Sequence, residues 1–547
     1  MINARALEQS AVVVDSRRSL LSVSAAILAL LACWALSSGC AARPATWRTV
    51  ADRRWLELRS EALILATDLP RPSALERFRE LEDVHRVLVE IFAHVAQGPR
   101  PRVEPFHIIL LARCSDLAAT SHGTAAGLVI DARDFSGTRL MVTCDATRQR
   151  RDALLHQMTH ALTAAHFAQI RPWLFEGLAR YYQTLRVEDT SVIIGVPPPN
   201  HFMSSPRRRS GVPASLERMR YSGAPHLVTL TSMTDAFYRG AVHDNHVGAW
   251  RLVHLLSSPT YRNRFVVYLR SLHAGASADD AWRAAFGDIA VGRIAAQYAN
   301  YVRRMSLHVY RVRRKSRPAF RDPDVQPLRP GEVHALWVRL YLAGRSGTEE
   351  GARTAVREHL SSMASEDPEW TGVPFWRAVH AYYSDDEAER AQVEPLLRAY
   401  AEREPRDFRA WLGLVRMGIN RAIPPDYLGV DGAVPAGLAA VEPDVRELLR
   451  SGGTARALNL VGWYYALRRL PRTGLAFAFR SVRADPTCGA CHDTLALLLY
   501  QDGRLAEAVA AQERAVALMA EDDPARTSER RLEHFRRARR NQTGTSR

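Results

Sequence analysis

Short apolar runs and one long helical pattern characterise the first part of the chain. The runs 55–58 and 63–67 are too short for helices and predict strands. From 73 to 96, apolar residues recur every three or four positions, which predicts a helix. Two further strand-like runs, 107–112 and 140–143, each end close to a cysteine. We therefore expect a small sheet accompanied by at least one helix.

The stretch 154–182 carries the clearest helical pattern. Its first part, LLHQMTHALTAAH, is apolar at helical spacing, and its second part, PWLFEGLARYY, opens on a proline that suits the first turn of a helix. A helical pattern returns from Leu227 to about Val302. Between them, the stretch 186–226 is rich in proline, serine and arginine, and we expect it to be a long loop.

Three side chains in this stretch have the chemistry of a metal site. His156 and His160 are four residues apart, so a helix places both imidazoles on one face. Glu176 follows in the second predicted helix. Two imidazoles and one carboxylate, with a fourth position open to water, form a common ligand set of catalytic zinc. The alternative is a pair of ordinary histidines, since the chain contains 19 of them.

These residues resemble the gluzincin metallopeptidases, in particular their bacterial peptidase MA-like branch. That branch pairs an H-E-x-x-H helix with a W-L-x-E-G-L-A-x-Y-Y helix. The second half of the pattern is matched by Trp173, Leu174, Glu176, Gly177, Leu178, Ala179, Tyr181 and Tyr182. The resemblance covers about residues 50–305 and implies an α+β zincin-like domain with a small sheet and active-site helices. It also implies that His156, His160 and Glu176 bind zinc.

The chain departs from that pattern at Gln157, where the family has its catalytic glutamate. In a zinc peptidase this glutamate takes a proton from the metal-bound water and passes it to the leaving amine. A glutamine amide can orient water but cannot carry that proton, and losing a general base typically costs about 10²–10⁴ in rate. Zinc binding needs only the three ligands. We therefore predict a zinc-binding domain with impaired or absent peptidase activity.

His246 is the candidate for a further catalytic group. The segment 246–256 resembles the family's Y-x-x-x-W-x-L-V-x-x-L helix, and His246 stands where a tyrosine is common. The resemblance implies that His246 donates a hydrogen bond to the oxyanion, with His243 or Tyr238 as substitutes. A rival hypothesis is an active zinc hydrolase that takes its base from His166, His243 or His246.

Beyond a basic, proline-bearing linker at 306–330, the pattern changes to repeated helices. Between 451 and 525, similar residues recur every 34 positions, which resembles tetratricopeptide repeats. Less regular patterns in 331–450 predict degenerate helical repeats, so we expect an all-α solenoid followed by a basic tail at 526–547. Such arrays present a groove to a peptide or protein partner. A metal-free adaptor is therefore the second rival hypothesis.

The first 40 residues have the pattern of an export signal. Arg17 and Arg18 precede an apolar run at 20–36, and small residues follow up to Cys40. This ending resembles a bacterial lipoprotein box, which implies that Cys40 carries the lipid anchor. We expect the protein in the bacterial cell envelope, at the periplasmic or outer-membrane face. An uncleaved membrane anchor is the alternative.

Export favours disulfide bonds. Cys114 and Cys144 could form one if the strands that precede them are neighbours. The motif at Cys488, Cys491 and His492 fits the C-x-x-C-H pattern of covalent haem attachment. It falls at a turn between repeats, however, and no haem domain surrounds it. We therefore expect a local disulfide or free thiols there, and no haem.

The charge balance adds little to this interpretation. The formal net charge is +16, but nearly all the cations are arginines and the one lysine is Lys315. The arginines are scattered, apart from short clusters such as 207–209 and 311–315. A compositional bias explains this better than a nucleic-acid surface. We expect a membrane and a protein or peptide as partners, and no nucleic acid.

Overall fold

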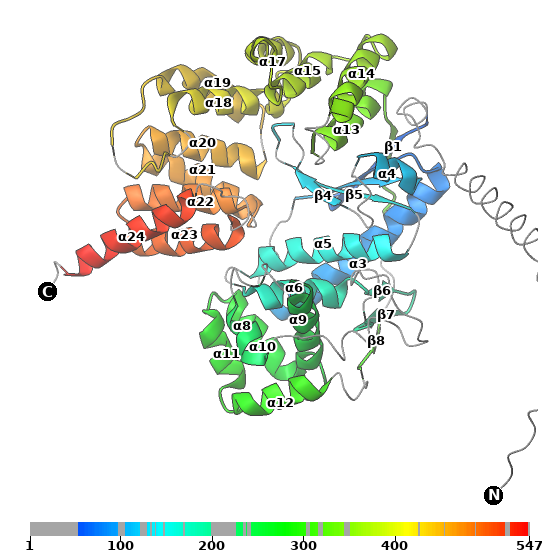
Figure 1. Ribbon diagram of the computed structural model, residues 1–547, viewed down its shortest axis with the longest axis vertical. Helices are drawn as coiled ribbons and strands as arrows, with labels where there is room; N and C mark the ends of the chain where they lie inside the picture. The colour runs from blue at the N-terminus through cyan, green and yellow to red at the C-terminus, as the bar shows by residue number, and fades with distance from the viewer. Residues whose placement is uncertain are drawn as a thin grey trace, which may run out of the picture. The chain divides into compact units, whose positions relative to one another are not determined.

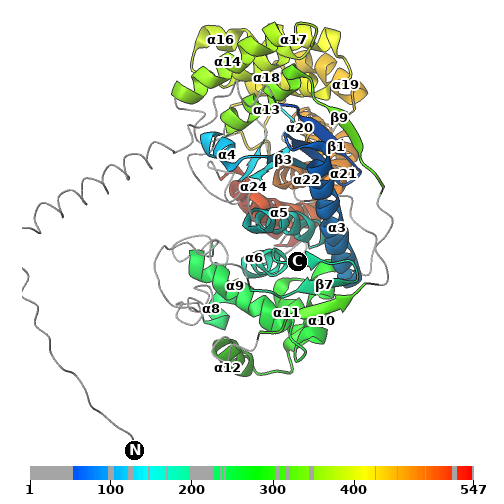
Figure 2. The ribbon, with the colours of Figure 1, turned by 90° about the vertical axis from the view of Figure 1, so that its right-hand side faces the viewer.

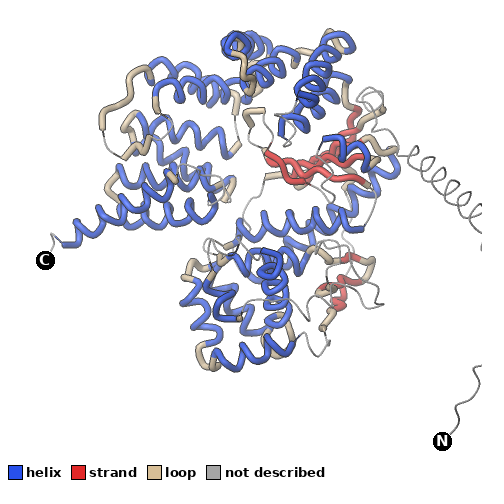
Figure 3. The backbone as a smooth tube through the Cα atoms, viewed as in Figure 1, coloured by secondary structure: helices blue, strands red, loops and turns tan. Residues whose placement is uncertain are grey.

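Strands occur only in the first part of the described chain, and helices alone follow from Pro330 onward (Figures 1 and 3). The computed structural model describes residues 53–96, 104–120, 128–131, 134–136, 138–145, 148–167, 170–197, 226–233, 237, 242–301, 307–314, 321–343, 350–424, 427–430, 432–452, 454–486, 488–519 and 526–544. The predicted export signal and Cys40 lie outside these residues. No helix within these ranges has the length and apolar content needed to cross a bilayer. The order of strands and helices makes the described chain α+β, with a sheet and a helical region.

Six strands form the main sheet: β1 (Leu56–Arg59), β2 (Leu63–Thr67), β3 (Phe106–Leu111), β4 (Leu128–Asp131), β5 (Arg139–Cys144) and β9 (Asp324–Pro327). Their spatial order is β4-β5-β3-β2-β1-β9. β2, β3 and β5 are parallel, whereas β1, β4 and β9 pair with antiparallel neighbours. Nearly every residue of β3 and β5 is buried, as expected for central strands. The strands predicted at 55–58, 63–67, 107–112 and 140–143 all appear here.

The pairing of β3 with β5 brings two cysteines together. Leu111, the last residue of β3, is paired with Cys144 at the end of β5. Cys114 lies three residues after Leu111 and begins helix α4 (Cys114–Thr120). A disulfide joins Cys114 to Cys144, with a Cα–Cα distance of 5.1 Å. The covalent link therefore ties the start of α4 to the neighbouring strand.

A second, three-stranded sheet is made of β6 (Arg186–Val187), β7 (Ser191–Ile194) and β8 (Tyr310–Arg313), in that order. The segment 306–330, expected to be a linker, contributes a strand to each sheet, because β8 pairs with β7 and β9 pairs with β1. Both are edge strands with mostly exposed side chains, so they lack the apolar alternation that would predict them. β6 and β7 likewise occupy the start of the predicted loop 186–226.

Helices cover the main sheet and surround the two predicted site helices: α3 (Arg71–Ala96), α5 (Arg148–His166), α6 (Pro172–Tyr182), α8 (Leu227–Ser232), α9 (Val242–Leu256), α10 (Arg262–His273), α11 (Ala278–Phe286) and α12 (Val291–Tyr301). Both ribbon views place α5 between the sheet and α6 (Figures 1 and 2). A Cβ at Gly177 would lie 2.7 Å from the carbonyl oxygen of Ala249, so only glycine permits the close approach of α6 to α9. This approach fixes the depth of Glu176.

The C-terminal helical region comprises α13 (Pro330–Ala343), α14 (Glu350–Glu366), α15 (Val373–Tyr382), α16 (Glu387–Ala391), α17 (Val393–Arg403), α18 (Phe408–Ala422), the 3₁₀ helix η4 (Leu438–Val441), α19 (Glu442–Arg450), α20 (Ala455–Leu467), α21 (Pro471–Ala484), α22 (Gly489–Gln501), α23 (Leu505–Met519) and α24 (Thr527–Gly544). From α20 onward, each helix packs against the next. Cys488 and Cys491 form a disulfide at the start of α22.

The segment expected to be a basic tail is helix α24. Phe535 on this helix is fully buried, and Leu532 is 8 % exposed. Arg531 forms a buried ion pair with Asp493 of α22. The arginines that surround the two apolar residues obscure their one-turn spacing in the sequence. Part of the basic charge is thus used in packing α24 rather than in a solvated tail.

One loop between β4 and β5 reaches the C-terminal helical region. Phe135 is 2 % exposed and its ring contacts Phe375 and Tyr382 edge-on, at centroid distances of 6.2 and 5.1 Å. The adjacent Asp134 is buried and forms an ion pair of 2.7 Å with Arg339 of α13. Phe135 has a φ of +65°, which a bulky residue rarely adopts. The packing of its ring offsets this backbone cost.

Candidate metal centre

Three side chains from two helices converge on one point. His156 and His160 lie one turn apart on α5, and Glu176 projects from α6. The Nε2 atoms of the two histidines are 3.0 Å apart. Glu176 places its Oε1 atom 3.4 Å from Nε2 of His160 and its Oε2 atom 3.7 Å from Nε2 of His156. An ion with tetrahedral bonds of about 2.0–2.1 Å would hold its ligand atoms about 3.3 Å apart. These three residues could therefore hold one metal ion.

His156 and Glu176 are in the protonation states that a metal requires. Burial, together with the neighbouring His160, lowers the pKa of His156 to about 3, so this imidazole is neutral near pH 7. Burial of Glu176 favours its protonated form, but the imidazoles of His160, His156 and His246 hold the pKa of its carboxyl well below the usual value. The site thus combines a neutral nitrogen donor with an ionised carboxylate.

Gln183 orients His156 from the side opposite the metal position. It directly follows α6 and is wholly buried. Its Oε1 lies 3.1 Å from Nδ1 of His156. Because an amide oxygen only accepts, Nδ1 carries the proton and Nε2 keeps its lone pair, which accepts from Nε2 of His160 at 3.0 Å and would bind a metal instead. This is the usual outer partner of a metal-binding histidine, and no feature of the sequence had indicated it.

Arg180 determines which nitrogen of His246 carries a proton. Its Nη2 donates to Nδ1 of His246 at 2.6 Å, and its Nε lies 3.7 Å from Oε2 of Glu176. A guanidinium only donates, so Nδ1 of His246 is the acceptor and the neutral ring carries its proton on Nε2. That Nε2 lies 3.9 Å from Oε2 of Glu176. His246 therefore presents an N–H donor toward the candidate metal centre.

A cavity of about 520 Å³ opens at the ligands. Gln157, His160 and Glu176 line it together with residues of the main sheet and of the C-terminal helical region. Gln157 is half-buried. A molecule that occupies this cavity and reaches the ligands would therefore meet an amide at position 157, and not a carboxylate.

No protein-family model matches the chain, and no curated protein is significantly similar to it.

The other candidates from the sequence are placed elsewhere or lie outside the described residues. The Nδ1 atom of His166 bonds the carbonyl oxygen of Leu162 at 2.9 Å, and its ring packs against Phe92. Among the described residues, the group that could hold a metal ion is His156, His160 and Glu176, and His166 is not part of it. Tyr238 and the side chain of His243 fall outside the part of the chain that is described.

Proposed function

We propose that the chain is an exported zinc-binding protein with a gluzincin-type domain whose peptidase activity is impaired or absent. The observation that carries this proposal is the convergence of His156, His160 and Glu176 at ligand distances beside Gln157. Two imidazoles and a carboxylate suit zinc and leave a fourth position open. When bound, zinc would polarise a substrate carbonyl and lower the pKa of bound water.

The surrounding residues are suited to binding and orientation but not to proton transfer. The Nε2–H of His246 points toward the ligands, where it could donate to an oxyanion. At Gln157 the amide can accept and donate hydrogen bonds, yet it cannot take up a proton near neutral pH. This tautomer of His246 also counts against its use as the general base. The missing function is therefore proton transfer, and it is missing because position 157 carries an amide and not a carboxylate.

The rest of the chain fits an envelope protein that binds a partner. Two disulfides, Cys114–Cys144 and Cys488–Cys491, favour an oxidising compartment. The sequential packing of α20 to α24 supports a tetratricopeptide-like solenoid over 451–525, which would offer a groove to a peptide or protein. We place the lipid anchor at Cys40 on the sequence pattern alone.

Zinc analysis and one substitution test the proposal. The purified protein should contain one zinc per chain, and His160→Ala should lose it. Gln157→Glu should raise peptide hydrolysis at least tenfold over the natural protein, because it restores a general base. Gln157→Met, which has a side chain of similar length without an acid, is the matched control and should stay inactive.

Each alternative gives a different result in the same experiment. If the natural protein already hydrolyses peptides briskly and Gln157→Glu adds nothing, the chain is an active hydrolase that uses another base. If no zinc binds under saturating conditions, the proposal fails and the metal-free adaptor remains.

A further inference from the structure

Helix α23 of the C-terminal helical region contributes a buried arginine to the same cavity. Arg514 is 6 % exposed and lines the cavity with His160 and Glu176. Its Nη2 donates to the carbonyl oxygen of Ala164 on α5 at 2.9 Å. Within the described part of the chain, no carboxylate lies within 4.0 Å of its guanidinium. Burial lowers the pKa of Arg514 to about 10, and no acidic neighbour counters this.

Two arginines of the C-terminal helical region, the partly buried Arg339 and the buried Arg531, have their charge balanced. Arg339 and Arg531 form ion pairs with Asp134 and Asp493. A buried cation without an anion is costly, because the lost hydration is not replaced. Arg514 has one carbonyl oxygen in place of a carboxylate, and it borders an open cavity. The position is therefore suited to an anion that enters from outside.

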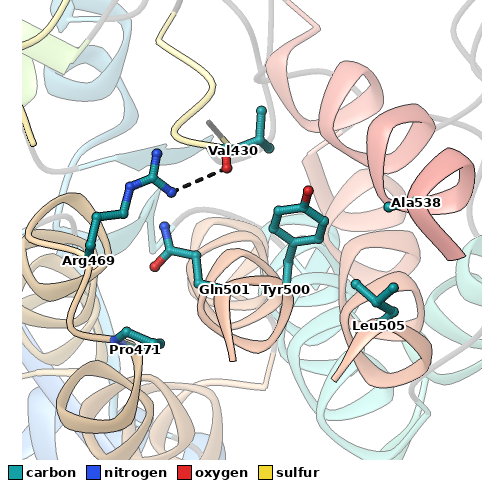
Figure 4. Close-up of a pocket in the computed structure, with 7 residues that line it drawn as sticks. All are labelled: Val430, Arg469, Pro471, Tyr500, Gln501, Leu505 and Ala538. Atoms are coloured by element: carbon teal, nitrogen blue, oxygen red, sulfur yellow. Dashed lines mark hydrogen bonds between the residues drawn. The ribbon is translucent and has the colours of Figure 1, made fainter. Parts of the chain in front are cut away.

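A second hollow in the C-terminal helical region shows the contrast (Figure 4). It has a volume of about 410 Å³ and is lined by Arg469, Tyr500 and Gln501 among others. Arg469 donates to three carbonyl oxygens, those of Gly429, Val430 and Gly432, at 3.1 to 3.2 Å. Its donors are thus occupied in holding a loop. We assign no ligand to this hollow.

The cavity between Arg514 and the ligands has room for a peptide. Three small residues of α5, Ala161, Ala164 and Ala165, line it beyond His160. Ala164, which accepts from Arg514, lies one helical turn past His160, or about 6 Å along the axis. An extended peptide covers this distance in about two residues. The planar guanidinium can hold a carboxylate through two parallel hydrogen bonds.

We propose that Arg514 binds a carboxylate of a peptide ligand, about two residues from the peptide group that faces the candidate metal centre. The carboxylate is either the C-terminus or an aspartate or glutamate side chain. This inference rests on the proposed function and extends it by naming the class of ligand. It also makes the C-terminal helical region part of the binding site, since α23 supplies the anchoring charge.

Binding of three labelled peptides to the zinc-loaded full-length protein tests this inference. The probes are a fluorescent alanine hexapeptide with a free C-terminus, its C-terminal amide, and the amide with one internal glutamate. We expect the free acid or the glutamate peptide to bind at least tenfold more tightly than the neutral amide, because charge-assisted pairs are strong. The peptide that gains affinity identifies the source of the carboxylate.

Substitutions at position 514 assign the effect to this side chain. Arg514→Met should abolish the preference for the acidic peptide and leave binding of the neutral amide within twofold. Arg514→Lys keeps the charge without the planar fork and should retain part of the preference. Arg472→Met is the matched control, because Arg472 on α21 has a side chain that is 94 % exposed. It should behave like the natural protein.

The outcomes separate this inference from the proposed function. Zinc binding without any preference for a carboxylate, or a preference that survives Arg514→Met, would overturn the role of Arg514 and leave the metal site intact. If the protein binds no zinc but still prefers the peptide with a carboxylate, and Arg514→Met abolishes that preference, the result supports the role of Arg514 and overturns the zinc proposal. If the natural protein binds none of the three peptides, the inference is wrong.

Discussion

Replacing Gln183 by leucine should weaken zinc binding while the chain stays folded. The Oε1 atom of Gln183 accepts the Nδ1 proton of His156 at 3.1 Å. Leucine has a similar volume but no acceptor. Without the acceptor, the ring of His156 loses its fixed orientation, and its proton can move to Nε2, the atom that would bind the metal.

The size of the effect follows from the burial of Gln183. Loss of such an outer partner typically costs 10–100-fold in metal affinity, which corresponds to about 1.4–2.7 kcal/mol. Gln183 is 0 % exposed, so water cannot take the place of the lost acceptor. We therefore expect the upper half of this range. Gln183→Glu should keep zinc affinity at or above that of the natural protein, because a carboxylate is the stronger acceptor.

Competition against a chromogenic zinc chelator at pH 7.5 gives the dissociation constants, and thermal unfolding of the metal-free proteins reports folding. Gln512→Leu is the control. Gln512 is also 0 % exposed, and its amide donates to Asp493 in the C-terminal helical region. This change should lower stability without altering zinc affinity. An unchanged zinc affinity in Gln183→Leu would refute the assignment of the Nδ1 proton and of the ligand atom.

Three further predictions concern the fold. Replacing both Cys114 and Cys144 by alanine should lower the free energy of unfolding by about 3.6 kcal/mol in urea titrations, because the disulfide closes a loop of 30 residues; an unchanged midpoint would contradict this. Burial lowers the pKa of His254 to about 4, so the unfolded chain binds a proton below about pH 6.5 that the folded chain does not. Stability should therefore fall by about 1.4 kcal/mol per unit as pH drops from 6.5 toward 4, and His254→Gln should remove this part of the slope in urea titrations of the metal-free protein. Phe135→Ala should cost about 3–5 kcal/mol in the same assay, because its ring is buried against Phe375; a loss below 1 kcal/mol would show that the loop is not anchored there.

Features that depend on local spacing could be predicted from the sequence. The four-residue interval between His156 and His160 places both on one face of any helix, whatever surrounds it. Short apolar runs were enough to predict β1, β2, β3 and β5, and most residues of β2, β3 and β5 are buried. Strands β8 and β9 could not be predicted. They are exposed edge strands that exist through their pairing with β7 and β1.

Only the tertiary structure decided which distant residues share the site. The crossing of α5 and α6 brings Glu176 to His160 and places Gln183 against His156, 27 residues away. Arg514 meets Ala164 across 350 residues of chain, a contact that no periodicity encodes. Side-chain type and spacing therefore determined which groups could bind a metal. The packing of helices determined which partners orient them, because such contacts arise from the close approach of surfaces that are remote in sequence.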